Sequence, residues 1–268
     1  NAYLSFVVTN LEEGTFSSEL VHIILTVQAV QNRLIDEIIN TATAGGYQDV
    51  HFDFEFIPQD DREAYNEFLR KIKPRLTQAG LILSAALAPK TSATQTGLLY
   101  EAHDYAAHGE INDFVVLMTY EWGYSAGPPL PVSPINDVEK VLTYALTEIP
   151  AEKILMGQNL YGYDWTLPFV QGESFARAIS PQQAIRIARE NNAAIQFDET
   201  AQAPFFNYYD DQGREHIVWF EDARSIQAKF DLIKRLGLRG IAYWKLGLAF
   251  PQNWLLLNDN FIINKRET

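Results

Sequence analysis

The chain has 268 residues, 47% of them hydrophobic and 13% aromatic, which suffices for a large core in a single α/β domain or in two smaller ones. Its net charge of −13 argues against a nucleic-acid partner, because phosphate binding needs clustered Lys and Arg. The lack of cysteine excludes disulfides and cysteine-based zinc sites, and no apolar run approaches the roughly 18–20 residues that a membrane helix needs.

Short apolar runs alternate with amphipathic segments along most of the chain. In chain order the pattern predicts a strand at 4–9, a helix at 25–42, a strand at 50–56, a helix at 60–78, a strand at 81–87, a helix at 98–108 and a strand at 113–120. It continues with a helix at 135–147, a strand at 154–160, helices at 181–192 and 222–236, and a strand at 240–246. Strands that alternate with helices indicate parallel βαβ units and a sheet covered on both faces. Pro74 is expected to kink or shorten the helix at 60–78.

Residues 194–220 depart from this alternation. They hold three short strand-like runs, AIQFD, PFFNYYD and HIVWF, with the turn DDQG between the last two. The pattern predicts a small antiparallel insertion before the last strand. With no low-complexity segment, interdomain linker or fixed-period repeat, residues 1–268 are interpreted as one domain that carries this β-rich insertion.

The stretch DVHFDFE at 49–55 carries the strongest functional signal. In a strand, His51, Asp53 and Glu55 point to one side, and Val50, Phe52 and Phe54 to the other. In a parallel barrel the apolar side packs on helices, and the polar side forms the floor of an active site at the C-terminal mouth. A solvent-facing strand edge is the alternative, and the apolar opposite face argues against it.

Other predicted strand ends carry aromatic and polar side chains. These are Tyr120 and Glu121 in MTYE, then Gln158, Tyr161 and Tyr163, and finally Trp244 in GIAYW. Each aromatic taken alone is more typical of a core position than of a binding site. Together with a carboxylate pair they favour carbohydrate recognition, because aromatic faces stack on sugar rings while amides and phenols meet hydroxyls.

FDFE within YQDVHFDFE resembles the DxxDxDxE signature of family 18 of the glycoside hydrolases, the chitinase family. MTYE resembles the MxYD motif of that family, and GIAYWKL its last-strand tryptophan segment. The runs ALAPKTSATQTGLLYEAHDYAAHG and ILMGQNLYGYDW are closer still to its spore-cortex-lytic N-acetylglucosaminidase branch, whose members often carry LysM domains. The resemblance covers nearly the whole chain and also points to LysM domains upstream in a full-length protein.

The resemblance implies a TIM (β/α)8-type barrel, and the likeness begins around the third strand of the family. We therefore expect about six barrel strands, with the first one or two βα units of the family lacking or not visible in this sequence. The resemblance makes Glu55 the general acid of a retaining mechanism in which the substrate's own 2-acetamido group is the nucleophile. By the same resemblance, Asp53 orients and polarises the acetamido group, and Tyr120 forms a hydrogen bond to its carbonyl oxygen. Its substrate contacts are His51, Glu121, Trp122, Gln158, Tyr161, Tyr163 and Trp244.

The signature departs from the family at two of its aspartates. Gln48 and His51 stand in their places, so the protonation of Asp53 and the pH optimum should differ from those of a chitinase. Glu121 stands where the family commonly has Asp. Glu55 itself is intact, which argues against a catalytically dead member.

The implied substrate is a peptidoglycan, in the spore cortex or cell wall, cut by an extracellular or spore-envelope enzyme that needs no cofactor. A chitinase is the nearest alternative, but the chain has only five tryptophans. Trp122, Trp165 and Trp244 are expected near the mouth, which favours a short or branched substrate. A non-catalytic glycan-binding module is a further alternative.

A metal-dependent enzyme also stays open at this point. His51-x-Asp53 fits part of a two-histidine, one-carboxylate iron site. The third ligand would have to come from one of the other histidines, which are His22, His103, His108 and His216.

Overall fold

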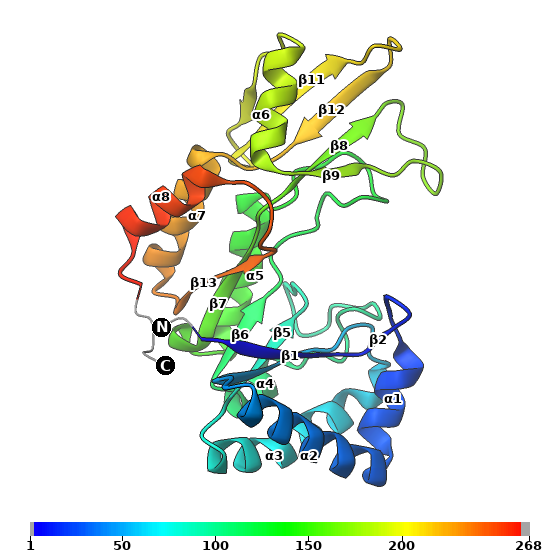
Figure 1. Ribbon diagram of the computed structural model, residues 1–268, viewed down its shortest axis with the longest axis vertical. Coiled ribbons are helices and arrows are strands. Elements are labelled where there is room, and N and C mark those ends of the chain that lie inside the picture. The colour runs from blue at the N-terminus through cyan, green and yellow to red at the C-terminus, as the bar shows by residue number, and fades with distance from the viewer. Residues whose placement is uncertain (1–2, 264–268) are drawn as a thin grey trace.

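The computed structural model describes residues 3–263. Its centre is a curled sheet of six parallel strands in the order β1, β4, β5, β6, β7 and β13 (Figure 1). Their bounds are Ser5–Thr9, Asp49–Asp53, Ile82–Leu87, Phe114–Leu117, Ile154–Asn159 and Gly240–Trp244. Within the described residues β1 and β13 are the two edges of the sheet and do not pair with each other. The predicted α/β fold of TIM type is confirmed, in the form of an open half-barrel.

Eight α-helices are present in the described part of the chain. They are α1 Ser18–Thr26, α2 Gln28–Ala44, α3 Arg62–Gln78, α4 Tyr105–Ile111, α5 Ile135–Glu148, α6 Pro181–Glu190, α7 Ala223–Leu236 and α8 Pro251–Asn260. Two 3-10 turns, η1 Gln59–Asp61 and η2 Ala151–Lys153, and a small hairpin of β2 Leu11–Glu12 and β3 Thr15–Phe16 complete this part. None of these helices is long and apolar enough to cross a membrane.

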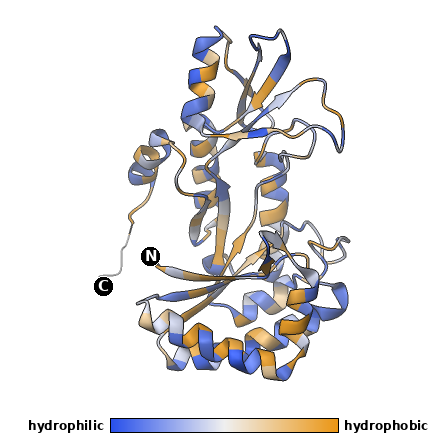
Figure 2. Cartoon of the chain, turned by 45° about the vertical axis from the view of Figure 1, so that its right-hand side comes forward, coloured by the Kyte–Doolittle hydropathy of each residue, from blue (hydrophilic) through white to orange (hydrophobic). Residues whose placement is uncertain are grey.

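Helices cover the outer face of the half-barrel, whereas α6 packs on the antiparallel sheet described below (Figure 1). One apolar cluster joins β4 and β5 to α1, α2 and α3, and a second joins β6 and β7 to α5 and α7. Figure 2 shows hydrophobic residues along the central strands, and both hydrophilic and hydrophobic residues on the surrounding helices. The inner strands are therefore mostly buried, whereas neither edge strand has a fully buried residue.

A second, antiparallel sheet lies at the far end of the molecule, at the top of Figure 1. Its strands, in spatial order, are β10 Gln196–Asp198, β11 Ala203–Tyr209, β12 Glu215–Trp219, β8 Gly162–Thr166 and β9 Arg177–Ile179. The segment 194–220 supplies β10, β11 and β12. The sheet also includes β8 and β9, which lie outside that segment, and β8 follows β7 almost directly.

Several element boundaries differ from the predicted ones. Two helices, α1 and α2, replace the single helix predicted at 25–42. Helical structure already begins after the N-cap Ser17, and the extended backbone of Val27 separates α1 from α2. The helix predicted at 98–108 begins only at Tyr105, where the Asp104 side chain accepts a hydrogen bond from the Ala107 amide. The strand predicted at 113–120 ends at Leu117.

Pro74 does not shorten α3. The helix continues through it to Gln78, with Phe68, Leu69, Ile72 and Leu76 all buried against the sheet. The prediction that Pro74 shortens the helix was wrong, because buried residues on both sides of the proline hold the helix together.

Candidate active site

The C-terminal ends of the parallel strands open into a cavity of about 810 Å³. Seven of the ten residues that the sequence singles out line it: Asp53, Glu55, Tyr120, Glu121, Tyr161, Tyr163 and Trp244. They come from β4, β6, β7, β8 and β13 and the segments that follow them. The meeting of these strand ends at one mouth is what a barrel-type sheet produces.

The alternation along residues 49–55 has the predicted consequence, although β4 ends at Asp53 and not at residue 56 as predicted. Phe52 and Phe54 are fully buried in the core beneath α3, whereas Asp53 and Glu55 line the cavity on the inner side of the sheet. The acids thus face the concave side of the half-barrel. The alternative of a solvent-facing strand edge does not hold, because β4 lies between β1 and β5.

Burial and mutual repulsion keep these acids partly protonated. Burial, with the negative charges of Asp53 and Glu121, raises the pKa of Glu55 to about 7, and burial raises the pKa of Asp53 to about 6. One carboxylate oxygen of Asp53, Oδ1, is buried and has no hydrogen-bond partner in the structure. Near neutral pH Glu55 can therefore hold a proton and release it, as a general acid must.

Glu121 is held by two phenols. The Tyr161 hydroxyl donates a hydrogen bond to Glu121 Oε1, and the Tyr163 hydroxyl lies 3.1 Å from the same oxygen. Burial raises the pKa of Glu121, and the two hydrogen bonds oppose that rise. Glu121 also has a left-handed backbone, with φ of 69°, which turns the chain sharply after β6. These two hydrogen bonds fix the position of its side chain.

His51 lies beside this cavity without lining it. Its Nδ1 lies 2.7 Å from the Ser84 hydroxyl, which donates to both carboxylate oxygens of Asp49 at 2.9 Å. Burial lowers the pKa of His51 to about 4, so the imidazole is neutral near pH 7. Our sequence reasoning missed Asp49 and Ser84. Asp49 continues the alternation of 51, 53 and 55 backwards, and Ser84 is the strand neighbour of His51.

Two other predicted contacts lie outside this cavity. Gln158 is fully buried, donates its amide to Asn159, and leaves its Oε1 without a partner. Trp122 lines neighbouring cavities instead. Trp165 was expected near the mouth, and this was wrong: it is buried in the core of the antiparallel sheet, with its indole N–H donating to the carbonyl of Gly127.

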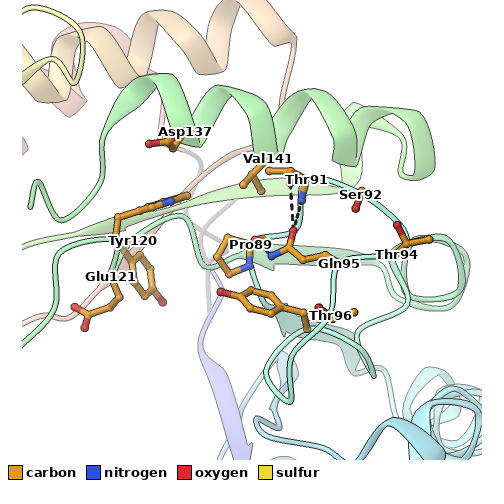
Figure 3. A pocket seen from close by; sticks show the side chains of 12 residues that line it. Pro89, Thr91, Ser92, Thr94, Gln95, Thr96, Tyr120, Glu121, Asp137 and Val141 are labelled. Atoms are coloured by element: carbon orange, nitrogen blue, oxygen red, sulfur yellow. Dashed lines mark hydrogen bonds between the residues drawn. The ribbon is translucent and has the colours of Figure 1, made fainter. Parts of the chain in front are cut away.

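A second cavity of about 520 Å³ adjoins the first (Figure 3). Tyr120 and Glu121 line both, and the chain after β5 supplies a polar wall. That wall consists of Thr91, Ser92, Thr94, Gln95 and Thr96. Hydroxyl and amide groups of this kind can form hydrogen bonds with the hydroxyls of a sugar.

The histidines do not assemble a metal site. His22 pairs with Asp61, His103 bridges main-chain groups, and His216 pairs with Asp164 in the antiparallel sheet. No group of three or more His, Asp or Glu side chains within residues 3–263 could hold a metal ion. The geometry of this part of the chain therefore does not support the iron-site alternative.

Comparisons with known proteins fit this geometry. The family model "Glycosyl hydrolases family 18" matches residues 14–249. The chain is 64% identical over 266 residues to the cortical fragment-lytic enzyme of Bacillus subtilis (strain 168), covering 99% of this chain and 62% of that protein. It is 55% identical over 260 residues to the enzyme of the same name from Bacillus cereus.

Solved structures give the same picture. The spore cortex-lytic enzyme SleL of Bacillus megaterium QM B1551 matches with a TM-score of 0.95 and 59% identity, over 98% of this chain and 60% of that one. A chitinase from Chromobacterium violaceum matches with a TM-score of 0.88 and 26% identity, over 95% of this chain and 78% of that one. The chain thus spans less than two thirds of the length of the first two relatives.

Proposed function

The chain belongs to glycosyl hydrolases family 18, and from this premise we propose that it hydrolyses β-1,4 bonds next to N-acetylglucosamine in peptidoglycan. The observation that carries the proposal is the placement of Glu55. It lies in the mouth of the half-barrel beside Asp53, in a cavity with aromatic walls, and its pKa is raised to about 7. A carboxyl group in that state can protonate a glycosidic oxygen near neutral pH.

In the proposed mechanism Glu55 protonates the leaving oxygen, while the 2-acetamido carbonyl oxygen of the substrate attacks the anomeric carbon and forms a cyclic oxazolinium ion. Water then attacks the same carbon and opens this ring, and the Glu55 carboxylate takes a proton from the water, so the acid is restored and configuration is retained. Asp53 orients and polarises this acetamido group, and Tyr120 donates a hydrogen bond to its carbonyl oxygen. Burial raises the pKa of the Tyr120 phenol, so the phenol keeps the proton that it must donate. Trp244, half exposed, provides the floor for the reacting sugar ring.

The choice of peptidoglycan rests on the relatives. Two Bacillus proteins called cortical fragment-lytic enzymes and a spore cortex-lytic enzyme share more than half of their aligned residues with this chain. We propose the same substrate class here, and action outside the cell in the spore cortex or cell wall. Glu121, Tyr161 and Tyr163 would contact the sugar, and Trp122 and the polar wall of the second cavity would contact the next sugar along.

The first test compares wild type with Glu55→Gln on spore-cortex peptidoglycan and on chitin oligomers. The variant keeps the shape of the side chain and removes the proton donor, so turnover should fall by about 100-fold or more. Glu110→Gln, an exposed change on α4, is the matched control and should keep full activity. Both wild type and control should be indifferent to EDTA.

Two alternatives give different results in the same experiment. Faster turnover of chitin oligomers than of peptidoglycan would favour the chitinase alternative, the activity named for the similar structure from Chromobacterium violaceum. Equal glycan binding by wild type and Glu55→Gln, without turnover by either, would favour a binding module and sink the proposed hydrolysis.

A further inference from the structure

Glu55 lies beyond the paired part of its strand. The last pair between β1 and β4 is Thr9 with Asp53, and the last pair between β4 and β5 is Phe52 with Ala85. Glu55 itself is therefore not among the paired residues of the sheet. Other groups must hold this part of the main chain if the carboxyl group is to have a fixed position.

The side chain of Asn10 replaces the missing ladder. Asn10 follows directly after β1 and is completely buried. Its Oδ1 accepts a hydrogen bond from the Glu55 amide at 3.0 Å, and its Nδ2 donates to the Glu55 carbonyl at 2.8 Å. Nδ2 also donates to the carbonyl of Ser17 at 3.0 Å, so both of its protons are used. One carboxamide thus clamps both main-chain polar groups of a single residue.

The peptides on either side of Glu55 are held as well. His103 Nδ1 accepts from the Ala88 amide at 2.8 Å, which leaves Nε2 to donate to the Phe54 carbonyl at 3.0 Å. The Ser18 hydroxyl donates to the Phe56 carbonyl at 2.5 Å. Three consecutive carbonyl groups, those of residues 54, 55 and 56, are thus each bound by a different side chain.

The backbone at Phe56 explains why such support is needed. Its φ is 55°, a left-handed conformation that residues other than glycine adopt only when their surroundings impose it. The chain therefore turns away from the strand direction one residue after Glu55. Without the hydrogen bonds from neighbouring side chains, this turn could relax and carry the Glu55 carboxyl group with it.

We propose that Asn10 is a positioning residue for the reaction, which fixes the carboxyl group of Glu55 by binding its main-chain amide and carbonyl. His103 and Ser18 support the same segment from its two sides. The role in turnover rests on the proposed function, whereas the ordering of residue 55 does not. Neither Asn10 nor His103 touches the cavity, so both act through the position of Glu55.

The test uses Asn10→Leu, which is similar in volume but makes no hydrogen bond, and Asn10→Asp, which keeps the acceptor and loses both donors. Asn10→Leu should lower kcat by about 100-fold with little change in KM, because a small misplacement of a catalytic group costs that much. Exchange of the Glu55 backbone amide, followed by NMR, should become about 5- to 10-fold faster. Asn10→Asp should keep slow exchange at this amide and show an intermediate loss of kcat.

Asn112→Ala is the control. Asn112 is almost fully buried, and its side chain also donates to a main-chain carbonyl, that of His108 at 3.0 Å. This control should lower the melting temperature and leave kcat and the Glu55 amide unchanged. Wild-type exchange at the Glu55 amide in Asn10→Leu would overturn the proposal, as would full kcat in a folded Asn10 variant. An inactive wild type with faster exchange in Asn10→Leu would defeat the proposed function and leave the clamp standing.

Discussion

Glu55 and Asp53 make the activity depend on pH in a direction that can be derived. The general acid has to be protonated, and burial with two neighbouring negative charges raises the pKa of Glu55 to about 7. We expect kcat/KM to fall as the pH rises through about 7, and a pH profile between 5 and 9 measures this. A profile that instead rises through this range would show that Glu55 acts in its ionised form.

Tyr161 should influence the alkaline limb of this profile, the fall of kcat/KM above about pH 7, through its hydrogen bond to Glu121. In Tyr161→Phe the carboxylate of Glu121 loses a donor, so it stays protonated to higher pH and its negative charge near Glu55 decreases. The pKa of Glu55 should then fall, and the alkaline limb of kcat/KM should move to lower pH. Tyr209→Phe, an exposed change on β11, is the control that should leave the limb in place. A limb that moves upward or not at all in Tyr161→Phe would contradict the coupling.

At the scale of elements, the close approach of β6 and β7 places Tyr120. A Cβ added at Gly157 would overlap the carbonyl oxygen of Leu117 and lie 2.9 Å from Cε1 of Tyr120. Gly157→Ala should therefore lower both the melting temperature and kcat, because the strands must separate and the phenol must move. Thermal unfolding and steady-state kinetics measure the two effects.

Gly109→Ala separates them. Gly109 lies in α4, away from the cavity, and a Cβ added there would lie 2.9 Å from the Ile149 side chain. This variant should lose stability and keep kcat. If Gly157→Ala also keeps kcat, the contact with Tyr120 has no role in its placement.

The sequence predicted elements well where a local pattern has one physical cause. Alternation in DVHFDFE was enough to place Asp53 and Glu55 on the concave face, because a two-residue period has no other outcome in a covered sheet. It could not reveal Asn10, whose partner lies 45 positions away. The break at Val27 and the membership of β8 and β9 in the antiparallel sheet also depend on tertiary pairing, which no local signal encodes.

For the whole molecule, buried acids link stability to pH. The pKa of the fully buried Asp49 is raised to about 6 by burial, with a smaller contribution from Asp113, while Ser84 and Arg239 oppose the rise. The pKa values of Asp53 and Glu55 are raised as well, to about 6 and about 7. Between the lower pKa values of the unfolded chain and these values, each of these acids binds more protons in the folded protein, so its own contribution to the unfolding free energy falls as the pH rises from about 4 to about 7. The buried imidazoles of His51, His103 and His108, whose pKa values burial lowers to about 4, about 4 and about 3, contribute in the opposite direction.

Asp49→Asn should remove the contribution of Asp49, so the unfolding free energy of the variant should rise relative to that of wild type as the pH goes from 4 to 8. The change removes one buried carboxyl group, whose shift of roughly two pKa units corresponds to about 3 kcal/mol at most. Denaturant unfolding at pH 4 and pH 8 measures the difference for wild type and variant. An equal change between the two pH values in both proteins would show that Asp49 titrates alike in the folded and unfolded states.

The joint between the two sheets has a consequence for how a glycan enters. Only two residues separate the end of β7 at Asn159 from the start of β8 at Gly162, and Tyr161 in this joint is bonded to Glu121. The Leu160 amide in the same joint donates to the carbonyl of Trp244 at 2.8 Å. The chain returns from β12 to α7 over a similarly short stretch, Phe220 to Asp222. We therefore expect the antiparallel sheet to form a fixed wall of the cleft, so that a glycan substrate would enter a groove that already has its final width.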